Sequence, residues 1–114
     1  MIKLINDVTL VGRLSVDLEL KKIGETELIN FNIAVPRDFK NEDGNYETDF
    51  IRCVAFGNLA TRLNEYCKKG DLVGIIGKIQ VSNYEDKDGN RRTSYEVVCS
   101  KISFLSSKKV EDEK

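Results

Sequence analysis

The chain has 114 residues, a length typical of a single domain with one modest core. Its 40% hydrophobic and 32% charged content exclude a disordered chain, and its apolar runs are too short to span a bilayer. The sequence has no histidine, which removes the commonest general base and zinc ligand, and a net charge of −1 does not indicate a partner.

The N-terminal third of the chain predicts two strands. Val8, Leu10 and Leu14 fall on one face of the first strand. A second, shorter strand is expected over Glu19–Lys22, followed by a turn at Gly24. The N-terminus lacks the long apolar segment of a signal peptide, so we expect a cytoplasmic protein.

The third strand shows the clearest alternation. Pro36 has no N–H to donate and is expected to end this strand. A polar Asp-Gly turn over Lys40–Asn45 then predicts a hairpin. One face of the strand is apolar and the other is more polar; the two sets are Ile29, Phe31, Ile33 and Val35, and Asn30, Asn32 and Ala34.

The returning strand carries aromatic and basic side chains on one face. Its small apolar face suits a closed core and holds Ile51, Cys53 and Ala55. Its other face holds Phe50, Arg52, Val54 and Phe56. Two phenyl rings and a guanidinium are unusual in a core and unfavourable on a bare surface, which indicates that this face binds something.

A single helix is predicted over residues 58–70. Asn58 is expected to cap its start, and Gly70 to supply a left-handed exit. The two lysines before Gly70 suit the negative end of the helix dipole. The apolar stripe of the helix consists of Leu59, Leu63 and Tyr66 or Cys67.

The C-terminal part of the chain predicts a second hairpin. A long strand over Leu72–Val81 contains Gly74 and Gly77, which mark close approach or bending. An Asp-Gly turn over Asp86–Asn90 and a returning strand over Tyr95–Ser100 follow, which residues 102–105 extend. We expect one domain over residues 1–106 and a polar, flexible tail over residues 107–114.

This order of elements predicts an all-β fold. About five coiled strands with glycine bends, two projecting hairpins and one helix between the third and fourth strands favour a small barrel over a sandwich, which needs more strands. The helix is expected to close one end. We therefore predict a five-stranded OB-fold barrel with a short capping helix and extended hairpin arms.

The aromatic face of residues 50–56 suits a single strand of nucleic acid. Any base can stack on an aromatic ring for about 1–3 kcal/mol, and Arg52 can hold phosphate oxygens. From spacing alone, packing of both phenylalanines in a core or a subunit interface is an equally good interpretation. Phe39 favours stacking because it lies beside a turn between two cations, and Tyr84 has the same character.

No catalytic or metal site is predicted. The three cysteines form no CxxC pair and are expected to be free, buried thiols. The acidic turn at Asp86–Asn90 lacks the glycine and glutamate positions of a calcium loop. We expect no cofactor and no enzymatic activity.

The sequence resembles the bacterial and phage single-stranded DNA-binding proteins of the SSB type over roughly residues 5–105. The resemblance depends on the order and spacing of several segments. They are Asn6–Leu14, Phe31–Val35, Thr48–Gly57 followed by Leu59 and Ala60, Tyr66–Asp71, and the hairpin that ends in Tyr95, Glu96 and Val97.

The resemblance implies an OB-fold, a homotetramer with one interface along the Asn6–Val11 edge, and salt-sensitive DNA binding without sequence preference. It also implies a role in replication, recombination or repair. The family's stacking positions match Phe39, Phe50, Phe56 and Tyr84. Arg52 is the strongest candidate for phosphate contact, and the weaker candidates are Arg13, Arg37, Lys40, Lys69, Lys78 and Arg91.

Two features depart from the family pattern. Only Lys78 is charged in the run from Lys78 to Tyr84, where related proteins often place two or three cations, so weaker phosphate contact is expected there. The acidic end Glu111–Lys114 lacks the long linker and terminal aromatic residue that recruit replication and repair enzymes. Recruitment of such partners is therefore in question, which favours a phage or mobile-element origin.

An alternative function is an OB-fold module of the primosome-accessory type that binds protein and has little affinity for DNA. The near-neutral charge and the reduced number of cations after Gly77 favour it slightly.

Overall fold

The computed structural model describes residues 4–105, which form an all-β fold with one short helix, as predicted. The helix, nine residues long, has neither the length nor the apolarity of a membrane-spanning helix. The elements are β1 (Val8–Leu14), β2 (Lys21–Ile23), β3 (Thr26–Lys40), β4 (Tyr46–Phe56), α1 (Asn58–Tyr66), β5 (Leu72–Glu85) and β6 (Arg91–Phe104).

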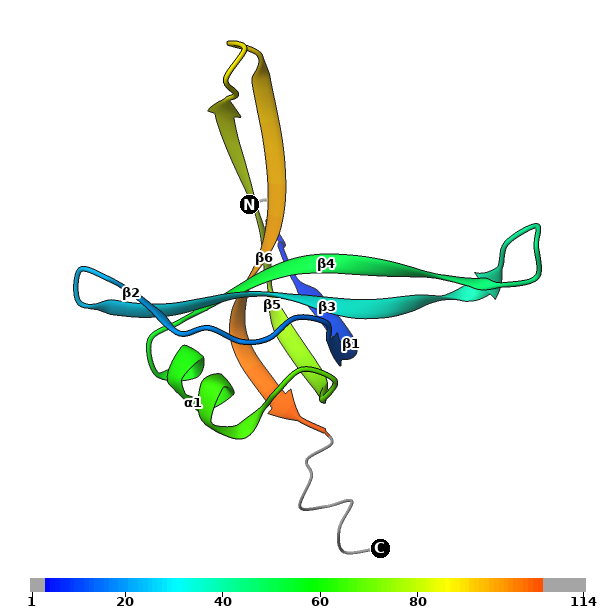
Figure 1. Cartoon of the computed structure of the whole chain (residues 1–114), viewed down its shortest axis with the longest axis horizontal. Helices are drawn as coiled ribbons and strands as arrows, with labels where there is room; N and C mark the ends of the chain where they lie inside the picture. The colour runs from blue at the N-terminus through cyan, green and yellow to red at the C-terminus, as the bar shows by residue number, and fades with distance from the viewer. Residues whose placement is uncertain (1–3, 106–114) are drawn as a thin grey trace, which may run out of the picture.

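Five strands close into a ring because β1 pairs on both of its edges (Figure 1). It pairs with β5 over residues 8–13, and with β3 only at Arg13 and Leu14. The ring continues from β5 through β6 and β4 to β3. The β4–β6 pairing is parallel and all other neighbours are antiparallel. The short β2 adds to the edge of β3, outside the ring.

The core lies inside the ring and follows the predicted alternation. Ile29, Phe31 and Ile33 of β3 are at most 3% exposed, as are Cys53 and Ala55 of β4. Helix α1 adds its own buried residues, Ala60 and Leu63, to the same cluster. The predicted capping helix therefore packs directly against the core.

Both ends of α1 differ from the prediction. The structure places Gly57, with φ 64°, at the cap position, and no side chain caps the helix, so the Asn58 cap is wrong. The helix ends at Tyr66, so the two lysines lie beyond its last turn. Gly70 has the predicted left-handed backbone (φ 96°), but it lies in the loop to β5 and its N–H bonds to the Leu14 carbonyl.

Pro36 does not end its strand, contrary to the prediction. β3 continues to Lys40, because the ladder with β4 tolerates an irregularity between Pro36 and Lys40. Pro36 still pairs with Thr48, and Lys40 pairs with Tyr46. The extra residues of β3 at this point bulge out of the ladder, which is where a proline can be accommodated in a strand.

Two hairpins extend from the ring as arms in different directions (Figure 1). We call them the β3–β4 arm and the β5–β6 arm. Their turns have the same construction. The first side chain, Asn41 or Asp86, accepts two backbone N–H groups of the turn. The fourth residue is Gly44 (φ 83°) or Gly89 (φ 82°), a conformation that favours glycine.

Gly77 lies at a register shift between β5 and β6. A Cβ at this position would collide with the carbonyl of Val98. The predicted close approach is therefore confirmed at Gly77. At Gly74 the nearest atom, Cδ1 of Leu105, would lie 3.4 Å from an added Cβ, so that position has room for a methyl group.

The three cysteines are free thiols, as predicted. Cys53 and Cys99 lie buried in the core. The neighbouring thiol of Cys99, together with burial, raises the pKa of Cys53. Cys67 is only partly buried, and desolvation raises the pKa of its thiol to about 11. Raised thiol pKa values are the opposite of what a cysteine nucleophile needs.

Candidate nucleic-acid interface

The outside of β4 carries exposed rings on both sides of an arginine. Phe50 is 63% exposed and Phe56 is 45% exposed, and Arg52 is exposed between them. The structure therefore excludes packing of these rings in the core of the protomer. Their remaining roles are contact with another molecule or with another copy of the chain.

Strand β3 leaves space beside these side chains. Phe50 lies opposite Ala34, and Arg52 lies opposite Asn32. Both neighbours are small or polar, so the flat side of the Phe50 ring is not covered by a large side chain of β3. Phe56 lies opposite the buried Leu28, which supports this ring from one side.

The outer surface of β4 continues onto the β5–β6 arm. The parallel register pairs Val54 with Val98, so both lie on the outside of the ring. Lys78 lies opposite Val98, and Tyr84 lies opposite Arg92 farther along the same arm. Opposed side chains in an antiparallel pair share a face, and residues two apart in a strand do so too. Tyr84, which is 53% exposed, therefore lies on the side of the arm that continues the β4 surface.

We call this surface the outer face. It consists of alternate residues of four strands, which are Leu28, Asn30, Asn32 and Ala34 of β3, Phe50, Arg52, Val54 and Phe56 of β4, Lys78, Gln80, Ser82 and Tyr84 of β5, and Arg92, Ser94, Glu96 and Val98 of β6.

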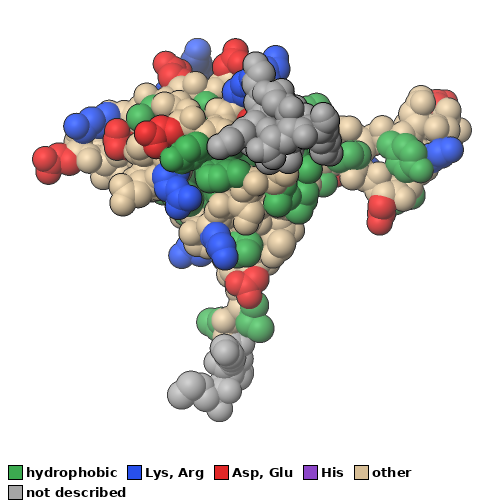
Figure 2. Space-filling model, turned by 90° about the horizontal axis from the view of Figure 1, so that it is seen from below, with side chains coloured by type: hydrophobic (Ala, Val, Ile, Leu, Met, Phe, Trp, Pro, Cys, Tyr) green, Lys and Arg blue, Asp and Glu red, His purple; other side chains and the backbone are tan. Residues whose placement is uncertain are grey.

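Phe39 lies near the end of the β3–β4 arm and is 63% exposed. The irregularity in β3 breaks the alternation before it, so register does not fix its side relative to Phe50. Figure 2 shows hydrophobic side chains at the far end of this arm with a basic side chain beside them. The ammonium of Lys40 lies 5.8 Å from the ring centroid of Tyr46, its partner at the end of the β3–β4 ladder. Tyr46 is 57% exposed, and sequence reasoning missed it.

Arg37 is held by acidic neighbours. Its Nη2 lies 3.0 Å from Oδ1 of Asp49, and its Nη1 lies 3.4 Å from Oε1 of Glu47. The hydrogen bonds from Arg37 lower the pKa of the Asp49 carboxyl and raise the pKa of the arginine. Side chains alternate between the two faces of β4, so Glu47 and Asp49 point to the face opposite Phe50. The cluster of Arg37, Glu47 and Asp49 therefore lies on the side of the arm away from Phe50. Arg37 therefore does not join the outer face.

The other predicted cations are all exposed, but they lie in different places. Arg13 of β1 lies opposite Ala34, whose other neighbour is Phe50, and its Nη1 donates to the carbonyl of Gly70. Lys69 follows α1 in a loop. Arg91 lies opposite Glu85, on the side of the β5–β6 arm away from Tyr84.

Arg13 shares the side of Phe50 through Ala34, and the predicted cations on the four strands of the outer face are Arg52 and Lys78. Within residues 4–105 neither side chain forms an ion pair. Arg92, which was not predicted, also lies there, but its Nε is 2.8 Å from Oδ2 of Asp86. This interaction lowers the pKa of Asp86, whose carboxylate also accepts the N–H groups of the turn.

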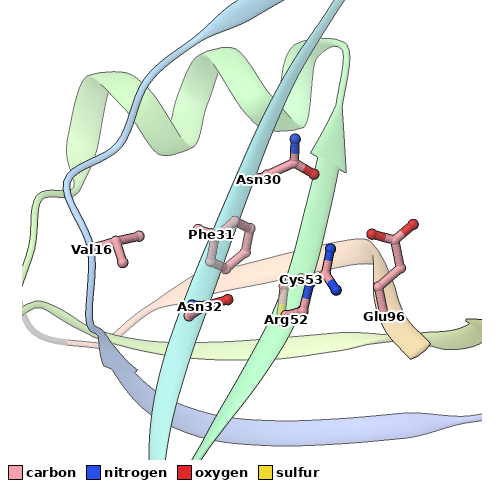
Figure 3. A pocket seen from close by; sticks show the side chains of 7 residues that line it. All are labelled: Val16, Asn30, Phe31, Asn32, Arg52, Cys53 and Glu96. Carbon is pink, nitrogen blue, oxygen red and sulfur yellow. The ribbon is translucent and has the colours of Figure 1, made fainter. Parts of the chain in front are cut away.

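A pocket of about 240 Å³ opens beside Arg52 (Figure 3). Its polar residues are Asn30 and Asn32 of β3, Arg52 of β4 and Glu96 of β6. Alternation places both asparagines outside the ring, but it does not reveal that β6 pairs beside β4. The proximity of Glu96 to Arg52 therefore required the structure.

Comparison with known proteins gives a consistent result. The model of the single-strand binding protein family matches residues 5–105. A single-stranded DNA-binding protein of Oceanobacillus iheyensis is 44% identical over 92% of this chain and 66% of its own length. Single-stranded DNA-binding protein 1 of Streptococcus pyogenes is 42% identical over 92% of this chain and 82% of its own length.

A single-stranded DNA-binding protein of Enterococcus faecalis is 38% identical over 97% of this chain and 60% of its own length. The chain thus spans between about three fifths and four fifths of these relatives. The match covers every strand of the ring and both arms, and with the closed ring it confirms the predicted OB-fold. The chain belongs to the single-strand binding protein family.

Proposed function

We propose that this chain binds single-stranded DNA without requiring a defined sequence, and protects it during replication, recombination or repair. The observation that carries the proposal is the pair of exposed rings, Phe50 and Phe56, on either side of Arg52 on an open strand surface. The relatives, whose names state single-stranded DNA binding, support the same function.

Stacking supplies affinity that does not depend on sequence, because every base has a flat face. Phe50, Phe56 and Tyr84 lie on the outer face, and Phe39 lies near the end of the β3–β4 arm. In duplex DNA the faces of the bases are covered by neighbouring base pairs, so only unpaired bases can stack on these rings. This arrangement favours single strands over duplex DNA.

Phosphate contact supplies the remaining affinity. Arg52 and Lys78 are the best placed cations, and Arg13 lies two strands from Phe50, with Ala34 of β3 between them. Lys40 follows Phe39 at the end of β3, in the β3–β4 arm. Each phosphate contact releases counterions, so affinity is expected to fall as salt concentration rises.

Binding of fluorescent oligo-dT across a salt series tests the proposal. Binding that weakens steadily with salt is the expected result. Absence of binding at low salt would instead support the primosome-accessory alternative, in which the outer face contacts protein. The family match does not favour that alternative.

We further propose that the chain assembles as a homo-oligomer, a tetramer in the form that the family resemblance implies. β1 pairs with β3 only at its last two residues, so one edge of its N-terminal part is open to another strand. Exposed apolar side chains lie on this strand and beside it; they are Leu4, Ile5, Val11, Ile76 and Leu105. Mass measurement in solution tests this proposal.

The family resemblance assigns recruitment of replication or repair proteins to an acidic C-terminal end, and that end of this chain lies outside the described residues. The expected tail over residues 107–114 lies there too. We propose that the protein acts in the cytoplasm of a bacterial cell or a phage-infected host, since that is where replication exposes single strands.

A further inference from the structure

Tyr46 is an exposed ring that the four stacking positions proposed above do not include. It is the first residue of β4, and 57% of it is exposed. The irregularity of this ladder lies in β3, because three residues separate Pro36 from Lys40 while one residue separates their partners, Thr48 and Tyr46. Alternation along the regular β4 therefore places Tyr46 on the same side as Thr48 and Phe50. Tyr46 extends the outer face toward the end of the β3–β4 arm.

Lys40 accompanies this ring. It lies opposite Tyr46 in the ladder, so the two side chains share a face, and its ammonium lies 5.8 Å from the ring centroid. A cation near the face of an aromatic ring is attracted by the ring quadrupole, which favours a fixed orientation of the phenol. Within the described part of the chain Lys40 forms no ion pair, so its charge is available to a phosphate.

The surface between the rings of Phe50 and Tyr46 is low and hollowed. Thr48 lies between them on β4, and its partner on β3 is Pro36. A depression of about 250 Å³ opens at this point, and Ala34, Pro36 and Thr48 contribute to its lining from the arm. Both paired positions between the rings carry small side chains. A single strand of DNA can therefore pass from one ring to the next along the arm.

The acidic side chains of this arm lie away from that path or at its end. Glu47 faces the opposite side, where it contacts Arg37 and where its Oε2 lies 3.3 Å from Nδ2 of Asn41. Glu42 and Asp43 are exposed in the turn beyond Tyr46. Carboxylates repel phosphate, so we expect the path of the DNA to end at Tyr46 and not to continue over the turn.

We propose that Tyr46 and Lys40 form a further stacking position for single-stranded DNA, an inference that rests on the proposed single-strand binding. Tyr46 stacks on one base, and Lys40 contacts a neighbouring phosphate. Tyr46 lies four residues from Phe50, which is about 13 Å along a strand. At about 3.4 Å per stacked nucleotide this distance corresponds to about four nucleotides. The position therefore lengthens the segment of DNA that one protomer holds.

A tryptophan placed at this position tests the contact directly. The chain has no tryptophan, so the indole emission of Tyr46→Trp comes from this position alone. Oligo-dT is expected to quench this emission, because a base stacks on the indole. Tyr95→Trp is the matched control. Tyr95 is 64% exposed on the β5–β6 arm, but it lies opposite Val81 on the side away from Tyr84, so its emission should change little.

Affinity measurements separate stacking from a structural role. Tyr46→Ala should weaken binding of oligo-dT about fivefold or more, the lower end of the range for one stacked base. Tyr46→Phe keeps the ring and should bind within about twofold of wild type on the same basis. Lys40→Gln should reduce the slope of log affinity against log salt concentration by about 0.7, the contribution of one phosphate contact.

Equal quenching in the two tryptophan variants would overturn the assignment. Wild-type affinity in a folded Tyr46→Ala variant would do so as well, and if Phe50→Ala weakened binding in the same assay, the proposed function would stand without this position. Absence of oligo-dT binding by the wild type would instead overturn the proposed function itself. If Tyr46→Ala does not fold, the quenching of Tyr46→Trp and its control decides the question.

Discussion

Phe50→Ala should weaken binding of short oligo-dT about tenfold without loss of stability. The ring is 63% exposed, so about 125 Å² of a side chain of about 200 Å² faces solvent, and a stacked base covers about half of that. At about 25 cal/mol per Å² this area is worth about 1.5 kcal/mol, which lies within the range measured for stacking. A difference of 1.4 kcal/mol is tenfold in affinity.

The same reasoning ranks the two rings of β4. Phe56 is 45% exposed, so its removal should weaken binding less, by about 1 kcal/mol or roughly fivefold. It lies opposite the buried Leu28, and its removal is therefore also expected to lower stability. The assay is fluorescence anisotropy with a labelled oligonucleotide, together with thermal unfolding of each variant.

Tyr66→Ala serves as the control for loss of an exposed ring. Tyr66 is 61% exposed, but it lies on α1 and packs near Phe104 with ring centroids 5.8 Å apart. Its removal should leave DNA affinity unchanged. The reasoning is refuted if Phe50→Ala changes affinity less than twofold while remaining folded, or if Tyr66→Ala weakens binding as much.

Three further predictions concern charge, packing and pH. Arg52→Ala should reduce the slope of log affinity against log salt concentration by about 0.7, which is the contribution of one phosphate contact on a single strand. Arg37→Ala should leave the slope unchanged, because the acidic partners of Arg37 already neutralise its charge. Equal slopes in the two variants would contradict this. Gly77→Ala should lower the free energy of unfolding by about 1–3 kcal/mol, because the added Cβ collides with the neighbouring strand. Gly74→Ala should leave the free energy of unfolding nearly unchanged. Urea unfolding of both variants measures the difference. The lowered pKa of the Asp86 carboxyl stabilises the fold at pH values above the ordinary aspartate pKa of 3.8, and this contribution is lost as pH falls through the lowered pKa. The difference in unfolding free energy between wild type and Asp86→Asn should therefore shrink in acid. A difference that grows in acid would contradict the stabilising role of the Asp86 carboxylate.

Local pattern was sufficient to predict much of the fold. The alternation of Ile29, Phe31 and Ile33 predicted which face of β3 enters the core, and Asp-Gly pairs predicted both turns. These features depend on neighbours in sequence. The prediction that Pro36 ends its strand was wrong because a bulge, which depends on the partner strand, accommodates it. The Asn58 cap was wrong because Gly57 takes the cap position.

The site was predictable in part for the same reason. Exposed rings at Phe50 and Phe56 follow from the alternation of one strand. The commitment of Arg37 to two carboxylates depends on side-chain geometry across the arm. The proximity of Glu96 to Arg52 depends on a parallel pairing between strands about forty residues apart, which no local pattern encodes.

Photo-cross-linking of the full chain to oligo-dT, with the linked residues identified by mass spectrometry, tests the central claim most directly. The account predicts cross-links to Phe50, Phe56 and Tyr84 on the outer face, and to Phe39 on the neighbouring arm. Cross-links confined to Tyr66, or to the β1 side of the ring, would contradict it.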